Sequence, residues 1–233
     1  MQPFASRTVD GIRYRLVAPS DAAALEELAL KEFCGRMPLY QQVGATSRSD
    51  VELSMDFLPK LALAGESLVA EDAGSGQLVG ARLSAVERRD SWPPSKHPLM
   101  VDAELQARYP KESIVMRAAD ATLTAANYFG AYSDVSAAMV SRMLAVRESH
   151  GRRGIGRRLQ EFALELAPSI GAQLVVGLTQ SYYSQRIYED LQFERVYAET
   201  IPDYVDPATG DKPFAGLAGT VHQEAVSLPS GSD

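Results

Sequence analysis

The sequence predicts a single α/β domain, and three observations support this fold class. The chain has 233 residues, 45% of them apolar and 23% charged, which is typical of a globular protein with a sizeable core. Stretches with apolar residues at alternate positions are interspersed with stretches whose apolar residues recur every three or four positions. We find neither an internal repeat nor a linker. We therefore expect one domain over residues 1–226 and a flexible tail over 227–233.

The first half of the chain combines alternating apolar patterns with helix-capping residues. Asp21 is placed to cap one helix, and residues 47–50 offer caps for a second. Residues 72–76 (DAGSG) are typical of a hairpin turn between two strands. The predicted elements, in order, are a strand at 11–18, a helix after Asp21, a helix at 51–63, strands at 66–71 and 77–86, and a long proline-containing loop at 87–112.

The second half alternates helices and strands. Ser181 is placed to cap a short helix whose apolar face carries Tyr183 and Tyr188. Gly171 suits the exit from the helix that precedes it. The predicted elements are a helix at 113–129, a strand at 137–146, a helix at 155–167, a strand at 172–178, the short helix after Ser181, and two strands within 193–226 around a turn at 206–212.

Composition limits the compartment and the partners. The one cysteine, Cys34, cannot form an internal disulfide, and the N-terminus lacks a signal-peptide pattern, so we expect a cytoplasmic protein. No stretch approaches the roughly 20 apolar residues of a membrane span. The net charge of −7 argues against nucleic-acid binding. The three histidines are scattered, so we expect no metal site. We expect a monomer or a homodimer.

One basic, glycine-rich segment stands out in this acidic chain. Residues 142–158 contain six arginines against one acid, Glu148. Within it, Gly151, Gly154 and Gly156 lie between a predicted strand and a predicted helix. The first turn of a helix exposes unpaired N–H groups, and glycine lets an anion come close to the backbone. The segment therefore predicts a diphosphate site; the alternative is a solvated basic face.

Three known phosphate-binding loops can be compared with this segment. A Walker loop needs Lys and then Ser or Thr after its last glycine, but Arg157 and Arg158 follow here. A dinucleotide fingerprint needs the glycine order G-x-G-x-x-G and a later acid, and both are missing. The segment Gly151-Arg152-Arg153-Gly154-Ile155-Gly156 resembles the acetyl-CoA loop of the GNAT acetyltransferases, except that Gly151 stands where that family has Arg or Gln.

The order of predicted elements also resembles the GNAT family over nearly the whole chain. The resemblance implies a single GNAT-like domain with a mixed, mostly antiparallel central sheet flanked by helices. It implies acetyl-CoA as co-substrate, with the pantetheine arm against the strand that ends at Val146 and the diphosphate on the loop. The cofactor-binding residues so implied are Leu144, Ala145, Val146, Gly151, Arg152, Arg153, Gly154, Ile155, Gly156 and Arg157.

Two further stretches, residues 33–40 and 181–203, resemble the invertebrate arylalkylamine N-acetyltransferases, the dopamine-acetylating type. That resemblance implies an amine N-acetyltransferase acting on a small primary arylalkylamine. The chain departs from the group at three positions: Met37 replaces its catalytic glutamate, Gln180 a serine and Gln192 a glycine.

The resemblance also assigns catalytic roles. The N–H of Val146 would hydrogen-bond the acetyl oxygen. Tyr188 would protonate the departing thiolate, because phenol and thiol pKa values are close. Ser184 would relay a proton through water. The general base stays open among Glu32, Glu87, Glu148 and a water chain.

For the amine, five aromatic residues suit a flat or apolar substrate, although aromatic residues at helical spacing are also typical of a core. They are Tyr40, Phe57, Tyr128, Tyr183 and Tyr204. The alternative function is a GNAT-fold CoA-binding protein that acts as a sensor or partner module with little turnover. The substitutions at Met37, Gln180 and Gly151 motivate this alternative.

Overall fold

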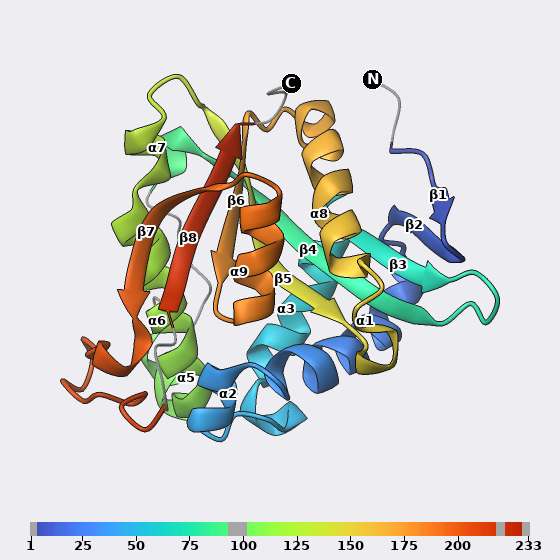
Figure 1. The fold of residues 1–233 in the computed structure, drawn as a ribbon. Helices are drawn as coiled ribbons and strands as arrows, with labels where there is room; N and C mark the ends of the chain where they lie inside the picture. Colours follow the sequence, from blue (N-terminus) through green and yellow to red (C-terminus); the bar gives the residue numbers. More distant parts are fainter. Residues whose placement is uncertain (1–3, 93–101, 218–221, 230–233) are drawn as a thin grey trace.

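A computed structural model describes residues 4–92, 102–217 and 222–229, and these residues build one twisted sheet covered by helices (Figure 1). The sheet has eight strands in the order β1-β2-β3-β4-β5-β6-β8-β7. The strands are β1 (Arg7–Val9), β2 (Ile12–Leu16), β3 (Leu68–Asp72), β4 (Leu78–Arg88), β5 (Ala137–Val146), β6 (Leu174–Thr179), β7 (Glu194–Thr200) and β8 (His222–Pro229).

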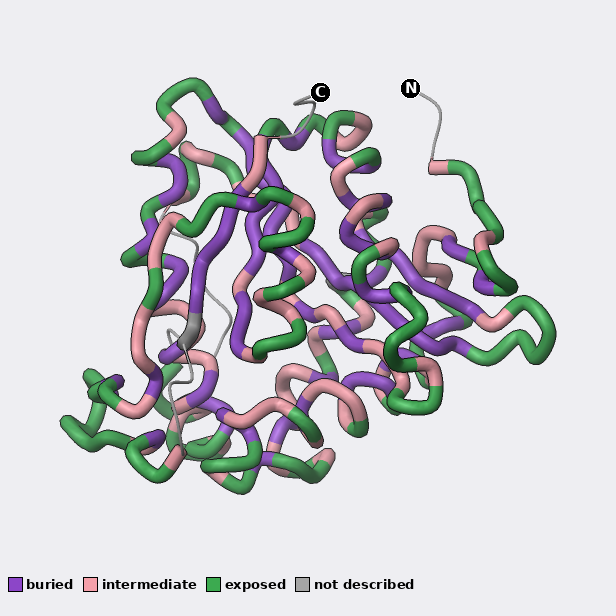
Figure 2. The backbone as a smooth tube through the Cα atoms, viewed as in Figure 1, coloured by how far each residue is buried: buried purple, intermediate pink, exposed green. Residues whose placement is uncertain are grey.

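Helices cover both faces of the sheet. The α-helices are α1 (Ala22–Leu28), α2 (Pro38–Gln42), α3 (Glu52–Ala62), α5 (Ala103–Arg108), α6 (Pro110–Ala126), α7 (Tyr128–Ala131), α8 (Ile155–Leu166) and α9 (Tyr182–Asp190). Helix α1 continues directly into a π-helix at Ala29–Cys34. Helices α8 and α9 lie on one face, while α1, α3 and α6 pack on the other (Figure 1). The central strands between these two layers are buried (Figure 2).

Every neighbouring pair of strands is antiparallel except β5 and β6, which are parallel. The expected mixed, mostly antiparallel sheet is therefore confirmed. Within the strands themselves, β5 matches the prediction at both ends, and α8 begins at the predicted residue. These elements were predictable because β5 is largely apolar, because α8 has an apolar face with helical periodicity, and because Gly154 precedes the helix.

Strands β5 and β6 pair over three residues only and then diverge. The last paired residues are Val140 and Val176, yet β5 runs on to Val146 and stays paired with β4. Between its pairs at Ser141 and Met143, β5 holds one extra residue, Arg142, which has no partner on β4. Such a bulge bends a strand and increases its twist. The bulge thus accounts for the separation of the two strands that is visible in Figure 1.

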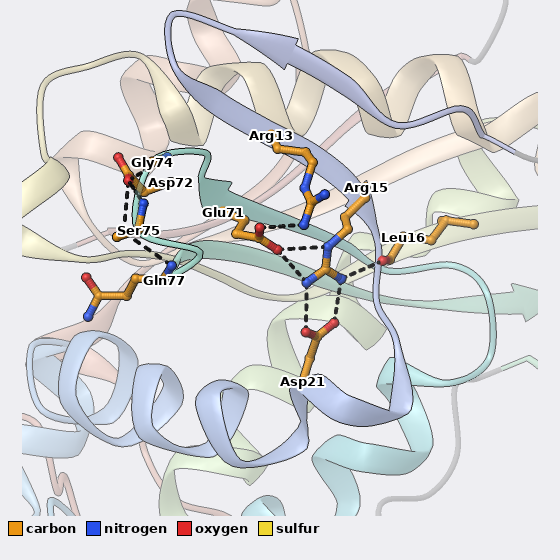
Figure 3. Close-up of polar contacts among 9 residues, drawn as sticks. All are labelled: Arg13, Arg15, Leu16, Asp21, Glu71, Asp72, Gly74, Ser75 and Gln77. Atoms are coloured by element: carbon orange, nitrogen blue, oxygen red, sulfur yellow. Dashed lines mark hydrogen bonds and ion pairs between the residues drawn. The ribbon is translucent and has the colours of Figure 1, made fainter.

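The predicted capping role of Asp21 is wrong. Its side chain accepts no bond from α1; instead it accepts two hydrogen bonds from Arg15, at 2.7 and 2.8 Å, and one from the N–H of Ala18. Arg15 also donates to Glu71 on β3, which pairs with Arg13 as well (Figure 3). The Asp21 carboxylate binds Arg15 in preference to a helix N–H, because a guanidinium is charged and donates two parallel hydrogen bonds to the two carboxylate oxygens.

The predicted hairpin turn is confirmed. The Asp72 carboxylate accepts hydrogen bonds from the N–H of Gly74, and from the N–H and hydroxyl of Ser75, the last two at 2.8 Å (Figure 3). These bonds hold the chain reversal between β3 and β4, as Asp commonly does in turns.

Two predictions of irregular structure are wrong in part. Residues 87–112 contain the end of β4, the helix α5 and the start of α6; residues 93–101 of this stretch lie outside the described residues. The prolines of this stretch predicted a loop, but Pro110 occupies the first turn of α6, where its missing N–H costs nothing. Residues 227–229 of the predicted tail belong to β8, and Ser227 is fully buried against β6. The rest of the tail lies outside the described residues.

Candidate active site

The loop between β5 and α8 offers a row of unpaired backbone donors. Gly151 to Gly154 are exposed, and Arg152 and Gly154 adopt left-handed backbone conformations with φ of 60° and 73°. Within the described part of the chain, the N–H groups of residues 152–157 have no acceptor. The first intrahelical bond of α8 comes from the N–H of Arg158. Six consecutive free donors at the start of a 12-residue helix form a cradle for an anion.

The glycines of this loop serve different purposes. A side chain at Gly154 would meet no atom within 4 Å, so its φ of 73° is what requires glycine. A Cβ at Gly156 would lie 3.1 Å from Ile187 on α9 and 3.7 Å from Val146 on β5. Gly156 therefore lets the start of α8 approach both elements closely.

Most arginines of the basic segment are paired with acids. Arg147 bonds Glu27, while Arg157 and Arg158 both bond Glu161. Among the described residues, Arg152 has no carboxylate within 4.0 Å. The local charge is therefore smaller than the sequence suggests, and the backbone N–H groups carry most of the attraction for an anion. A hollow of about 300 Å³ adjoins the loop on the side of β1 and β2, and it is lined by Val9, Asp10, Ile12, Tyr14, Arg153, Gly154, Arg157, Arg158 and Glu161.

The end of β5 presents backbone groups to the space from which β6 has turned away. The N–H of Arg147 donates to the carbonyl of Val79, which makes these two residues a hydrogen-bonded pair. In antiparallel strands such pairs alternate with non-hydrogen-bonded ones. Val146, opposite Gly80, and Leu144, opposite Arg82, thus point their N–H and C=O groups away from β4. This free edge could pair with an extended ligand as an added strand would.

Tyr188 lies at the point where β5 and β6 separate. Its side chain is 2% exposed, and a Cβ at Gly177 of β6 would sit 2.6 Å from its hydroxyl oxygen. The hydroxyl accepts a hydrogen bond of 2.6 Å from the amide of Gln160 on α8. Burial raises the pKa of Tyr188, and the nearby guanidinium of Arg82 opposes that rise. A protonated phenol is therefore held beside the end of the paired region.

Many solved structures share this arrangement of elements, whereas no family model matches the sequence. Mosquito arylalkylamine N-acetyltransferase like 5b has a TM-score of 0.80 at 19% identity, over 94% of this chain and 99% of that one. Polyamine N-acetyltransferase from Drosophila melanogaster has a TM-score of 0.76 at 21% identity, over 94% and 99%. Arylalkylamine N-acetyltransferase 2 from Aedes aegypti has a TM-score of 0.77 at 18% identity, over 95% and 100%. The chain has the GNAT fold.

On this GNAT fold, Ser184 acts in helix capping. The Ser181 hydroxyl accepts from the N–H of Ser184, and the Ser184 hydroxyl donates to the carbonyl of Ser181 at 2.9 Å. The predicted cap of α9 is therefore confirmed. Tyr183, predicted on the apolar face of α9, is 75% exposed, and that prediction is wrong. It forms an edge-to-face pair with Tyr182, which is 70% exposed.

The three candidate glutamates occupy very different surroundings. Glu32 lies on the π-helix, its side chain is 12% exposed, and it accepts a bond from the N–H of Glu148, just after β5. Glu148 itself is largely exposed, and Glu87 is tied to Arg142 and to the hydroxyl of Tyr128. Only Glu32 combines a shielded carboxylate with proximity to Val146. Met37, where the resembled group has its glutamate, is the residue before α2.

The five predicted aromatic residues do not line one site. Tyr40 and Tyr204 belong to the core on the α1 side, whereas Tyr128 packs against Trp92 and Phe129 in a separate cluster. Tyr183 is exposed, and Phe57 is on α3.

Within the described residues, no group of three or more His, Cys, Asp or Glu side chains could hold a metal ion. No helix in the described part is long and apolar enough to span a bilayer.

Sequence reasoning missed a buried polar cluster under α8. Arg82, Ser84 and Gln160 are fully buried, and Ser141 is 8% exposed. A signal was present, since Arg82 interrupts an apolar strand and Gln160 adjoins the apolar face of its helix. Periodicity shows such residues as exceptions but gives no indication that they meet.

Proposed function

We propose that this protein is an acetyl-CoA-dependent N-acetyltransferase, and that its acceptor is a small primary arylalkylamine. The main support for this proposal is the row of free N–H groups at residues 152–157, which lies next to the free edge of β5. The cradle matches a diphosphate, and the edge matches the two amide groups of a pantetheine arm. One ligand that carries both features in sequence is acetyl-CoA.

The proposed residues have separate tasks in acetyl transfer. Leu144, Ala145 and Val146 would hold the thioester along β5, with the N–H of Val146 directed at the acetyl oxygen as negative charge develops there. Glu32 would take the proton that the attacking amine loses, directly or through water. Tyr188 would give its proton to the departing sulfur.

The substrate class rests on three supports. The stretches at 33–40 and 181–203 resemble the arylalkylamine group, and two of the similar structures are named arylalkylamine N-acetyltransferases. The acidic balance of the chain favours a cationic amine. A third similar structure is named a polyamine N-acetyltransferase that forms N-acetylagmatine, so agmatine and polyamines belong in the comparison set.

The test is a steady-state assay of thiol release from acetyl-CoA with a panel of amines. We expect tyramine and tryptamine to be acetylated with a higher kcat/KM than agmatine, polyamines or lysine-containing peptides. Activity confined to polyamines or peptides would overturn the arylalkylamine class and leave acetyl transfer standing. Tight binding of acetyl-CoA without turnover on any amine would favour the sensor function instead.

A further inference from the structure

A positive charge is buried beside Tyr188 without a negative partner. The guanidinium of Arg82 is fully buried, and no carboxylate of the described residues lies within 4.0 Å of it. Its Nε donates to the Oε1 of Gln160 at 2.7 Å and its Nη1 donates to the hydroxyl of Ser84, while its Nη2 has no partner. The charge lies opposite Leu144 of β5, whose backbone faces the diverging strands.

Gln160 links Arg82 to Tyr188 through two hydrogen bonds: Arg82 donates to Gln160, and Gln160 donates to Tyr188. Arginine can only donate, so the oxygen of the Gln160 amide must face Arg82. The amide nitrogen of Gln160 therefore faces Tyr188 and donates to its hydroxyl oxygen at 2.6 Å. Because Gln160 presents only N–H groups to Tyr188, it cannot accept the phenol proton. That proton is therefore directed to the side away from Gln160, where the Ser141 hydroxyl or a bound ligand can accept it.

The other surroundings of the hydroxyl place that acceptor between β5 and β6. Gly177 of β6 and Ser141 of β5 adjoin the hydroxyl, and both directly follow the last paired residues of their strands. The free edge of β5 begins just beyond. Burial raises the pKa of Tyr188, while Arg82 and hydrogen bonds from Ser141 and Gln160 favour the phenolate.

We infer that Arg82 and Gln160 are positioning residues that direct the Tyr188 proton toward the departing thiolate and stabilise the phenolate that remains. This rests on the proposed acetyl transfer. In that step the amine nitrogen bonds the acetyl carbon as the carbon–sulfur bond breaks. The sulfur takes the proton of Tyr188, the surplus proton of the amine goes to Glu32 or water, and solvent reprotonates Tyr188 after the products leave.

A purely structural role would not require this charge. An unpaired guanidinium in a core is destabilising, and apolar residues of similar volume commonly give a more stable protein. A fixed buried cation is useful where negative charge appears transiently, because it needs no reorganisation and water does not screen it. The Nη2 of Arg82 has no hydrogen-bond partner, as expected of a group that interacts with negative charge only while that charge is present.

The decisive variant is Gln160→Glu, assayed in the full-length protein. The introduced carboxylate would pair with Arg82, so the melting temperature should be maintained or raised. It would also accept the Tyr188 proton and reverse the last hydrogen bond. We expect kcat with acetyl-CoA to fall by about 10- to 100-fold, with KM for acetyl-CoA changed by less than about threefold. A residue needed only for folding would lose activity in step with stability.

A double-mutant cycle separates action through Tyr188 from an independent effect. In a Tyr188→Phe background, Gln160→Glu should cause no further loss of kcat, because the proton it misdirects is gone. Gln173→Glu makes the same chemical change on the exposed residue before β6, and its kcat should stay within about twofold of wild type. If Gln160→Glu does not fold, Arg82→Met provides the test, with stability kept and kcat lowered.

The inference is overturned if Gln160→Glu or Arg82→Met keeps wild-type kcat, or if the loss adds fully to that of Tyr188→Phe. Those outcomes leave acetyl transfer intact, since the wild-type protein would still release thiol. A wild-type protein that releases no thiol with any amine would overturn the proposed function and this inference together.

Discussion

At the scale of single residues, the loop glycines make the cofactor proposal testable. Gly154→Val places a β-branched side chain at φ of 73°, where it is strained, so the backbone of the loop should shift and move its free N–H groups. Each bond to a charged group is worth about 1.5–3 kcal/mol, so losing one or two should weaken acetyl-CoA binding at least tenfold. Calorimetry measures the affinity directly.

Gly154→Asn is the matched control for this glycine. Asparagine tolerates a left-handed backbone far better than valine does, so its binding loss should be the smaller of the two. Gly156→Val is expected to destabilise the fold, because its side chain would push Ile187 away and lower the free energy of unfolding by about 1–3 kcal/mol. Unchanged affinity in a folded Gly154→Val protein would exclude this loop as the diphosphate site.

Tyr188 gives a second prediction at the residue scale. Tyr188→Phe keeps the ring against Gly177 and Phe193 but removes the acidic proton. Turnover should fall by roughly 10²–10⁴, the usual contribution of general acid catalysis, with little change in acetyl-CoA affinity. The unpaired Gln160 amide should cost about 1–3 kcal/mol of unfolding free energy. Unchanged turnover per folded molecule would make Tyr188 a core residue only.

At the scale of elements, the π-helix after α1 explains how a glutamate reaches the end of β5. Single π-turns are rare and occur often at functional sites, because they shift the side chains that follow them. Here the widened turn carries Glu32, which accepts hydrogen bonds from Arg36 and from the N–H of Glu148. The π-helix therefore places a carboxylate against the residues that follow β5, five positions before Met37 in the chain.

Glu32→Gln tests that assignment. The amide keeps the size of the side chain and an acceptor for the N–H of Glu148, but it cannot take up a proton. We expect kcat to fall by about 10²–10⁴, with little change in the KM for acetyl-CoA. Glu148→Gln, which changes a largely exposed carboxylate, should be near wild type. Equal losses in both variants would point to the electrostatics of the loop rather than to a base.

At the scale of the whole molecule, one buried ion pair ties the long connection between β7 and β8 to α6. Asp206 has a side chain 1% exposed and accepts two hydrogen bonds from Arg117, one of them at 2.7 Å. Burial opposes ionisation of Asp206, but the bonds from Arg117 and from the N–H of Ala208 outweigh it and lower its pKa below the ordinary 3.8. Its stabilisation is therefore present above the unfolded pKa and is lost as pH falls through the folded pKa.

Asp206→Asn should lower the free energy of unfolding at pH 7 by about 1.5–3 kcal/mol, because the largely buried Arg117 would lose its charge partner. Urea unfolding at pH 7 and near pH 3 measures the difference, which should shrink at the lower pH. Asp211→Asn, on an exposed residue of the same connection, should change stability by less than about 0.5 kcal/mol. A difference that is equal at both pH values would contradict the ion-pair explanation.

The sequence by itself determined the order of elements and the position of the phosphate-type loop. The strand at 137–146, the glycines and the helix from Ile155 are local features, and local periodicity and backbone preference suffice to specify them. The same reasoning placed Tyr188 on the short helix and Ser181 at its start. It failed at Asp21 and along 87–112, because Arg15 of the preceding strand binds the Asp21 carboxylate and Pro110 starts a helix instead of a loop.

Only the tertiary structure decided what surrounds Tyr188 and the loop. Arg82 and Gln160 are 78 residues apart in the chain, and Gln160 and Tyr188 are 28 apart, yet they form one hydrogen-bonded chain. The bulge at Arg142 that parts β5 from β6, and the ion pairs that reduce the positive charge of the loop, likewise depend on partner strands and helices. Side-chain pairing across strands and faces depends on packing at long range, and a linear pattern contains no information about it.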